Sequence, residues 1–255
     1  PKLLRRAGAT VTAMGSEPNG LNINDGVGST HLDPLRQAVH AHGADVGLAL
    51  DGDADRCLAV AADGSIVDGD QILALLALAF AESGQLRDHT VVVTVMSNLG
   101  LHVAMRARGL KVLTTAVGDR YVLEALRERG LSLGGEQSGH MVMPSFSPTG
   151  DGLLTGLSVL ARMAATNSPL VELAGIVTRL PQVLRNVEVH DRAAVAASEE
   201  VSAAVAEVTA ELGETGRVLL RPSGTEQLVR VMVEAKTHEQ AVEIADRLCA
   251  VVEKL

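Results

Sequence analysis

The chain has 255 residues, a length that fits one large domain or two to three small ones. Hydrophobic residues make up 47% and charged residues 21%, a composition that excludes an intrinsically disordered chain. The net charge of -9 repels a polyanion and the chain has only two Phe, one Tyr and no Trp on which bases could stack, so we expect no nucleic-acid partner.

The sequence predicts neither a membrane span nor a disulfide. The longest apolar run, Ile72 to Ala81, has ten residues, whereas a bilayer requires about 20. Cys57 and Cys249 are far apart and belong to no Cys-x-x-Cys pair, which favours two small buried thiols over a disulfide or a zinc site. We therefore expect no membrane partner and a protein of the reducing cytoplasm.

The first residues are typical of a chain that starts inside a helix. Residues 2–7 read as the end of a helix that Gly8 caps, and residues 9–14 (ATVTAM) read as a strand. Because the chain begins with Pro1 rather than Met, we expect further sequence upstream.

Helical and strand-like segments alternate along residues 31–165, which predicts an α/β fold with mixed or mostly parallel sheets covered by helices. Asp33 and Pro34 suit the cap and the first turn of the first of these helices, and Asp63-Gly64 suits a tight turn. The predicted strands are 45–50, 57–62, 91–95 and 111–115, and the predicted helices are 31–42, 70–83, 99–108, 119–129 and 151–165.

A different pattern follows the Pro-containing stretch 167–181, which resembles a domain boundary. Its predicted elements are strands 183–189, 216–220 and 228–234 and helices 198–212 and 238–254, an α+β layout. We therefore predict three domains: 1–66 as the C-terminal part of an α/β domain, 67–176 as an α/β domain, and 177–255 as a small α+β domain.

Three carboxylates stand at alternate positions in residues 51–56 (DGDADR), directly after a predicted buried strand. Like charges this close raise one another's pKa unless a cation neutralises them, and oxygen ligands suit a hard ion such as Mg²⁺. An EF-hand is excluded, because its sixth position is Arg56 and its twelfth is Ala62. A solvated acidic turn stays open as the alternative, although α/β sites gather at the carboxyl ends of strands. Arg56 either holds a phosphoryl oxygen or offsets the local charge.

Residues 221–226 (RPSGTE) lie between two predicted strands and combine a guanidinium group, two hydroxyls and a glycine. These groups suit a phosphate dianion, and Arg230 reaches the same place if the hairpin folds it back. An ordinary hairpin turn also uses Pro, Ser and Gly, so that alternative stays open. The loop is not a Walker loop, because no Gly-Lys-Ser/Thr follows a glycine-rich run.

Residues 134–140 (GGEQSGH) place a carboxylate and a hydroxyl two residues apart between glycines, a pattern that suits vicinal sugar hydroxyls. A polar turn is the alternative, and a lone His140 is more often structural than catalytic. Residues 117–120 (VGDR) are ambiguous in the same way: Asp119 is a candidate helix cap and Arg120 a candidate solvated helix charge.

Together, and in this order, the three loops resemble those of the α-D-phosphohexomutase superfamily, and the resemblance covers the whole chain. Residues 22–24 (NIN), 28–31 (GSTH) and 117–122 (VGDRYV) look most like its phosphoglucosamine mutase branch. The resemblance implies interconversion of glucosamine 6-phosphate and glucosamine 1-phosphate, a cytoplasmic step towards bacterial cell-wall precursors. In the family a phosphorylated serine gives its phosphoryl group to the sugar phosphate, a 1,6-bisphosphate turns over in the site, and the opposite phosphate returns to the serine.

The resemblance also implies a role for each matching residue. Arg56 would lie beside the reacting phosphoryl group, with His140 as a proton-transfer residue or phosphate contact. The implied Mg²⁺ ligands are Asp51, Asp53 and Asp55; the implied sugar-binding residues are Glu136 and Ser138; and the implied ligands of the non-reacting phosphate are Arg221, Ser223, Gly224, Thr225 and Arg230.

The sequence departs from the family pattern at three places. No serine has the family's Thr-Ala-Ser-His-Asn-Pro context, so we expect the nucleophile to be absent and this chain alone to be inactive. Ala54 replaces the second glycine of the usual DGDGDR, a change we expect to be tolerated unless the position requires positive φ. Gln227 replaces the usual Pro after the phosphate loop, which loosens the loop without removing a ligand.

Two alternatives to a phosphoglucosamine mutase fragment stay open. One is a phosphoglucomutase or phosphomannomutase with the same mechanism, which differs in its preference at the second carbon of the sugar. The other is a non-catalytic sugar-phosphate-binding protein.

Overall fold

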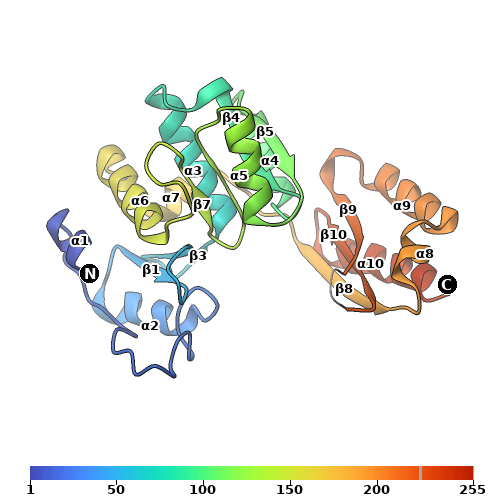
Figure 1. Cartoon of the computed structure of the whole chain (residues 1–255), viewed down its shortest axis with the longest axis horizontal. Coiled ribbons are helices and arrows are strands. Elements are labelled where there is room, and N and C mark those ends of the chain that lie inside the picture. Colours follow the sequence, from blue (N-terminus) through green and yellow to red (C-terminus); the bar gives the residue numbers. More distant parts are fainter. Residues whose placement is uncertain (224–225, 255) are drawn as a thin grey trace. The chain divides into compact units, whose positions relative to one another are not determined.

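The computed structural model describes residues 1–223 and 226–254, which form two compact units (Figure 1). The first unit comprises Pro1–Ser97 and Leu101–Thr178, and the second comprises Asn98–Gly100 and the chain from Arg179 onward. The predicted boundary at residue 66 falls inside the first unit, and the three-domain division stays a prediction.

The N-terminal part of the first unit contains α1 (Lys2–Arg6) and α2 (Asp33–His42). The predicted strand over residues 9–14 is wrong: these residues pair with no other strand in the described chain, and most of them are exposed. An alternation of small and apolar residues forms a strand only where a neighbouring strand accepts its backbone hydrogen bonds. Asp33 is the first residue of α2 and not its cap, since the cap position belongs to Leu32.

The first sheet is antiparallel in the order β1-β2-β3, made of β1 (Val46–Leu50), β2 (Cys57–Ala61) and β3 (Ile66–Val67). Gly47 of β1 lies under Val39 of α2, whereas its neighbour Leu48 lies against α6 (Gly152–Thr166). Because successive strand residues point to opposite faces, one helix covers each face of this sheet. Its β1–β2 connection is the 51–56 loop.

The second sheet has the order β5-β4-β6-β7, with parallel pairing of β4 to β5 and to β6 and antiparallel pairing of β6 to β7. It is the one sheet of the described chain that contains parallel strands, and two of its three pairings are parallel, so the expectation of mixed sheets is confirmed. The strands are β4 (Thr90–Thr94), β5 (Lys111–Thr115), β6 (Gly134–Gly135) and β7 (Met141–Val142).

The core of the first unit is built around α3 (Gly69–Glu82), the apolar helix that the sequence predicted. Asp68 caps it with a reciprocal Gln71 capping box. The unit also contains α4 (Leu99–Arg106, whose first two residues belong to the second unit), α5 (Asp119–Glu128), the short 3-10 helix Arg87–His89 and α7 (Leu170–Ala174). Sequence analysis missed α7, because it lies in the stretch interpreted as a boundary.

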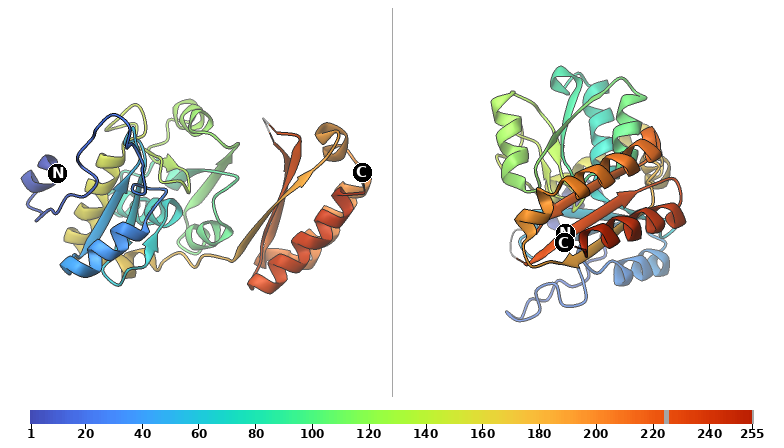
Figure 2. Two further views of the ribbon diagram at one scale, coloured as in Figure 1. Left: turned by 90° about the horizontal axis from the view of Figure 1, so that it is seen from below. Right: turned by 90° about the vertical axis from the view of Figure 1, so that its right-hand side faces the viewer.

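The second unit is an antiparallel sheet, β8-β10-β9, with helices packed against it (Figure 2). Val229, Val231 and Val233 point from β10 to one face, where they join a core with residues of α9 and α10. The elements are β8 (Gln182–Glu188), α8 (Arg192–Ala196), α9 (Glu199–Leu212), the 3-10 helix Gly213–Thr215, β9 (Arg217–Pro222), β10 (Leu228–Glu234) and α10 (His238–Val252). This is the predicted α+β layout with one additional short helix, α8.

Both cysteines are free and buried, as the sequence predicted. Burial raises the pKa of the Cys57 thiol to about 12. Among the described residues, no helix combines the length and the apolar character that a bilayer crossing requires.

A buried ion pair anchors the end of β10. Glu234, which is fully buried, accepts from Arg217 Nε at 2.8 Å and from Arg217 Nη2 at 3.1 Å. We predict that Glu234→Ala lowers the free energy of unfolding by about 3–5 kcal/mol, because it removes a buried carboxylate that accepts hydrogen bonds from Arg217 and from the Leu99 N–H. Urea denaturation followed by circular dichroism measures this. Glu243→Ala, at an exposed position of α10, is the control; a loss below about 1 kcal/mol for Glu234→Ala would contradict the prediction.

Candidate functional site

The 51–56 loop brings three carboxylates together at the carboxyl end of β1. One oxygen from each of Asp51, Asp53 and Asp55 lies within 4.8 Å of the others. Asp51 shapes the loop: its Oδ1 accepts from the backbone N–H of Arg56 at 3.1 Å, and its carbonyl accepts from Ala54 N–H at 3.2 Å. The loop therefore has the convergence that the sequence pattern predicted.

These oxygens fit a hard cation better than a solvated turn. Oδ1 of Asp55 is buried and has no hydrogen-bond partner in the part of the chain that the structure describes, although an unpaired buried carboxylate oxygen is costly. The Arg56 guanidinium offsets part of the charge, with its Nε 3.6 Å from Asp51 Oδ2 and 3.9 Å from Asp55 Oδ1. Both distances exceed a hydrogen bond, so acceptor capacity is left for a bound ion.

Ala54 occupies a left-handed backbone conformation, with φ +59°. An L-residue in this region carries a penalty of roughly 1–2 kcal/mol, which glycine avoids. This position does require positive φ, so Ala54 in place of the family's glycine lowers the stability of the loop.

The 134–140 loop is docked on the 51–56 loop by backbone hydrogen bonds. Cys57 N–H donates to Gly139 carbonyl at 3.0 Å, and Arg56 and His140 form an antiparallel bridge. A Cβ atom at position 139 would lie 2.5 Å from the Cys57 carbonyl oxygen, so only glycine permits this approach. Two motifs more than eighty residues apart thus form one polar surface within the first unit.

Each polar side chain of this second loop has a defined position. Glu136 Oε1 accepts from Gly118 N–H at 3.2 Å, which ties the loop to the start of α5. Ser138 Oγ is buried and without a partner in the described chain. His140 Nδ1 lies 2.9 Å from Asp55 Oδ2.

Of the two simple interpretations of residues 117–120 (VGDR), a helix cap at Asp119 and a solvated charge at Arg120, the structure supports the second. Asp119 is the first residue of α5 and not its cap, which is Gly118. Arg120 is a solvated helix charge: its side chain is 74% exposed and pairs with Glu124 at 2.9 Å.

The 221–226 loop belongs to the second unit and carries two facing guanidinium groups. Arg221 of β9 is in register with Arg230 of β10, and residues directly opposite in a sheet share a face. Desolvation and, to a lesser degree, the charge of Arg230 lower the pKa of Arg221. Nε of Arg230 is buried and has no hydrogen-bond partner among the described residues, and Ser223 is buried. Arg230 Nη2 also pairs with Glu226 Oε2 at 3.1 Å, so one carboxylate of this loop offsets part of the positive charge and Arg221 is the cation left to attract an anion. Gly224 and Thr225 lie outside the described residues.

Sequence analysis missed one residue that contacts this loop. Arg192, the first residue of α8, donates Nη1 to the carbonyl oxygens of Ser223 and Glu226, the latter at 2.8 Å. No local signal marks it, because it lies about thirty residues upstream in sequence.

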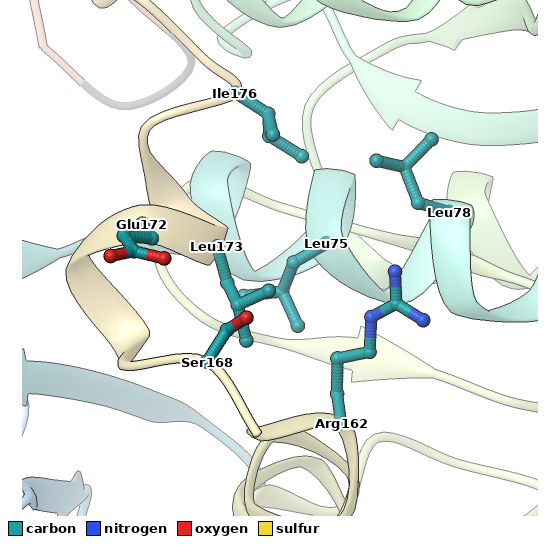
Figure 3. A pocket seen from close by; sticks show the side chains of 7 residues that line it. All are labelled: Leu75, Leu78, Arg162, Ser168, Glu172, Leu173 and Ile176. Atoms are coloured by element: carbon teal, nitrogen blue, oxygen red, sulfur yellow. The ribbon is translucent and has the colours of Figure 1, made fainter. Parts of the chain in front are cut away.

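A cavity of about 220 Å³ lies elsewhere in the first unit (Figure 3). It is lined by Leu75, Leu78, Arg162, Ser168, Glu172, Leu173 and Ile176. The 51–56 loop meets the start of α6, where Gly152 N–H donates to Ala54 carbonyl at 2.8 Å. Arg162 follows about ten residues later, which is about 15 Å along the helix. The cavity is therefore separate from the loops, and its Arg162 is paired with Glu82.

Comparison with known families identifies two family domains in this chain. Residues 68–180 match the profile of the phosphoglucomutase/phosphomannomutase alpha/beta/alpha domain III, and residues 184–251 match that of the phosphoglucomutase/phosphomannomutase C-terminal domain. The chain belongs to the phosphoglucomutase/phosphomannomutase family, a group of phosphohexomutases.

Within that family, similar curated relatives are phosphoglucosamine mutases. That of Nocardia farcinica is 65% identical over 255 residues, which is all of this chain and 56% of the relative. That of Mycolicibacterium smegmatis is 62% identical over 97% of this chain and 55% of the relative. The chain thus spans about half the length of the curated relatives it matches.

Solved structures share the fold. An Aspergillus fumigatus N-acetylphosphoglucosamine mutase in complex with GlcNAc-6P and magnesium has a TM-score of 0.72 at 22% identity, covering 91% of this chain and 53% of that one. A Burkholderia thailandensis phosphoglucomutase/phosphomannomutase family protein has a TM-score of 0.74 at 26% identity, covering 89% and 50%.

The strain at Ala54 is testable. We predict that Ala54→Gly raises the free energy of unfolding by about 0.5–1 kcal/mol, because relief of the left-handed strain exceeds the extra entropy of glycine in the unfolded chain. Thermal or urea denaturation measures it. The reverse control is Gly64→Ala in an open turn with φ +84°, which should cost about 1 kcal/mol. Destabilisation by Ala54→Gly would contradict the assigned backbone conformation.

Proposed function

We propose that this chain supplies the metal-, sugar- and phosphate-binding parts of a phosphoglucosamine mutase, an enzyme that interconverts glucosamine 6-phosphate and glucosamine 1-phosphate through a 1,6-bisphosphate. The observation that supports the proposal most is that the 134–140 loop, which carries the proposed sugar-binding residues, is docked on the 51–56 loop, which carries the carboxylate cluster. The relatives at 60–65% identity support the same assignment.

In this proposal Asp51, Asp53 and Asp55 hold Mg²⁺, which suits an all-oxygen ligand set. The ion, when bound, offsets negative charge on the phosphoryl group that is transferred. Arg56, whose guanidinium is partly exposed beside the cluster, donates to that phosphoryl group. The magnesium in the Aspergillus fumigatus complex supports the choice of ion.

The sugar and the second phosphate are assigned to the other two loops. Glu136 and Ser138 hold sugar hydroxyls, and the unpartnered Ser138 Oγ supports this role. Arg221, Ser223 and Arg230, with Gly224 and Thr225, bind the phosphate that is not reacting, and the facing guanidinium groups support that assignment. Arg192 positions this loop through its carbonyl groups.

We further propose that the 255-residue chain binds its ligand without turning it over. Phosphoryl exchange requires a phosphorylated serine, and no serine of this sequence stands in the family's context. A coupled assay of the purified chain with glucosamine 6-phosphate, Mg²⁺ and the 1,6-bisphosphate should detect no product above the uncatalysed background. Robust conversion would contradict the proposal.

Metal binding tests the carboxylate assignment. Asp53→Asn should weaken Mg²⁺ binding at least tenfold in a calorimetric titration of the chain, because it removes one of three charged ligands. Asp63→Asn, in the exposed turn between β2 and β3, is the matched control and should bind Mg²⁺ as the unmodified chain does. Equal affinities for all three proteins would refute the metal site.

Ligand binding tests the phosphate loop and the sugar preference. Arg221→Ala and Arg230→Ala should each weaken glucosamine 6-phosphate binding about tenfold or more, as the loss of a charge-assisted contact does. Arg185→Ala, on β8 and paired with Asp246, is the control. Glucosamine 6-phosphate should bind more tightly than glucose 6-phosphate or mannose 6-phosphate; a reversed order would favour a phosphoglucomutase or phosphomannomutase.

A further inference from the structure

Glu226 is the one carboxylate in the sequence of the 221–226 loop, and it is bonded to a proposed phosphate ligand. Its Oε2 accepts from Arg230 Nη2 at 3.1 Å, and both side chains are partly exposed, at 56% for Glu226 and 32% for Arg230. Ion pairs with this degree of exposure contribute little to stability, so opening the pair costs little. Glu226 therefore occupies a guanidinium group that it can also release.

The loop fixes the point from which the Glu226 side chain starts. Glu226 N–H donates to Ser223 Oγ at 3.3 Å, and the Glu226 carbonyl accepts from Arg192 Nη1 at 2.8 Å. Ser223 N–H in turn donates to the Leu228 carbonyl at 2.9 Å, across the hairpin. Because the backbone is held in this way, the carboxylate leaves Arg230 by rotation of its own side chain.

Arg230 has donor capacity that Glu226 does not use. A guanidinium group carries five N–H donors in a planar fork. The bond to Glu226 uses Nη2, whereas Nε is buried and has no partner in the described part of the hairpin. A phosphate dianion has three terminal oxygens and can engage such a fork through two of them. Phosphate is thus a better acceptor for this side chain than the single carboxylate oxygen that holds it.

Glu226 and a bound phosphate repel each other at Arg230. Arg230 lies opposite Arg221 in the β9–β10 register, so an anion that binds both guanidinium groups comes close to the Glu226 carboxylate. Two negative charges at this separation raise the free energy of the bound state. When no anion is bound, the carboxylate instead offsets one of the two facing positive charges.

We propose that Glu226 is an internal counter-ion that a sugar phosphate displaces from Arg230, so that the loop holds phosphate less tightly than its two arginines alone would. This inference rests on the proposed phosphate site. It also gives the carboxylate a use, because a 1,6-bisphosphate that turns over in the site must leave this loop once in each cycle.

The first test measures the glucosamine 6-phosphate affinity of the 255-residue chain by calorimetry. Glu226→Gln removes the charge but keeps the length of the side chain, and it should tighten binding about three- to tenfold, because the phosphate no longer competes with a carboxylate. Glu207→Gln is the matched control. It removes the same charge from α9, where the carboxylate pairs with Arg247, and should leave the affinity within about twofold. Weaker binding by Glu226→Gln would show that Glu226 holds Arg230 in place for the ligand, and would overturn the inference.

The second test is a double-mutant cycle between positions 226 and 230. Arg230→Ala removes the guanidinium group for which the two anions compete, so Glu226→Gln should then tighten binding by no more than about twofold. In an Arg221→Ala background, where Arg230 is intact, the gain should stay at about three- to tenfold. Thermal unfolding checks that each variant folds. An equal gain with and without Arg230 would mean that Glu226 acts only as a distant charge, and would contradict the proposal.

The outcomes separate this inference from the proposed function. If the unmodified chain does not bind glucosamine 6-phosphate, or if Arg221→Ala binds it as tightly, the phosphate loop is wrong and the inference fails with it. If Arg221→Ala weakens binding while Glu226→Gln leaves it unchanged, the phosphate loop stands and the counter-ion role is wrong.

Discussion

The candidate site depends on one backbone contact, the antiparallel bridge that joins Arg56 to His140. Without it, the 51–56 loop would be an acidic turn at the end of β1, and the 134–140 loop would be an ordinary connection from β6 to β7. The bridge forms because Gly139 lets two backbones approach more closely than a Cβ atom allows. It then brings an imidazole, a carboxylate cluster and the polar groups of the second loop to one place. The polar groups of the candidate site therefore come together only when the first unit packs, because each loop alone supplies only part of them.

The two units hold their polar groups by different means. In the first unit, backbone hydrogen bonds bring distant segments together, and negative charge accumulates. In the second unit, a hairpin register places Arg221 opposite Arg230, whose guanidinium also pairs with Glu226. The polar groups of the first unit are thus gathered by contacts between distant segments, and those of the second by the pairing of neighbouring strands.

Sequence reasoning predicted the helices and strands that have strong periodicity, including α3 and the hairpin β9–β10, and it selected the three loops. It was wrong for residues 9–14, because a strand depends on a partner that composition does not reveal. It also missed α7, α8 and Arg192. Arg192 contributes through contacts with residues about thirty positions away in the chain, so no local pattern marks it. Convergence of Asp51, Asp53 and Asp55 was predictable from their alternate spacing, whereas the bond from His140 to Asp55 was not.

Ala54 shows how a family's residue preference follows from backbone geometry. The loop must reverse direction between Asp53 and Asp55 for both carboxylates to converge, and it does so with positive φ at the residue between them. Glycine adopts this conformation without strain, which is the physical reason for its place in the common motif. Alanine adopts it here because several contacts hold the loop from both sides: Asp51 accepts from Arg56 N–H, and Gly152 N–H donates to the Ala54 carbonyl. The contacts that hold Ala54 in its strained conformation are thus the same contacts that position the candidate metal ligands. A residue with a larger side chain than alanine would weaken both the loop conformation and the positioning of these ligands.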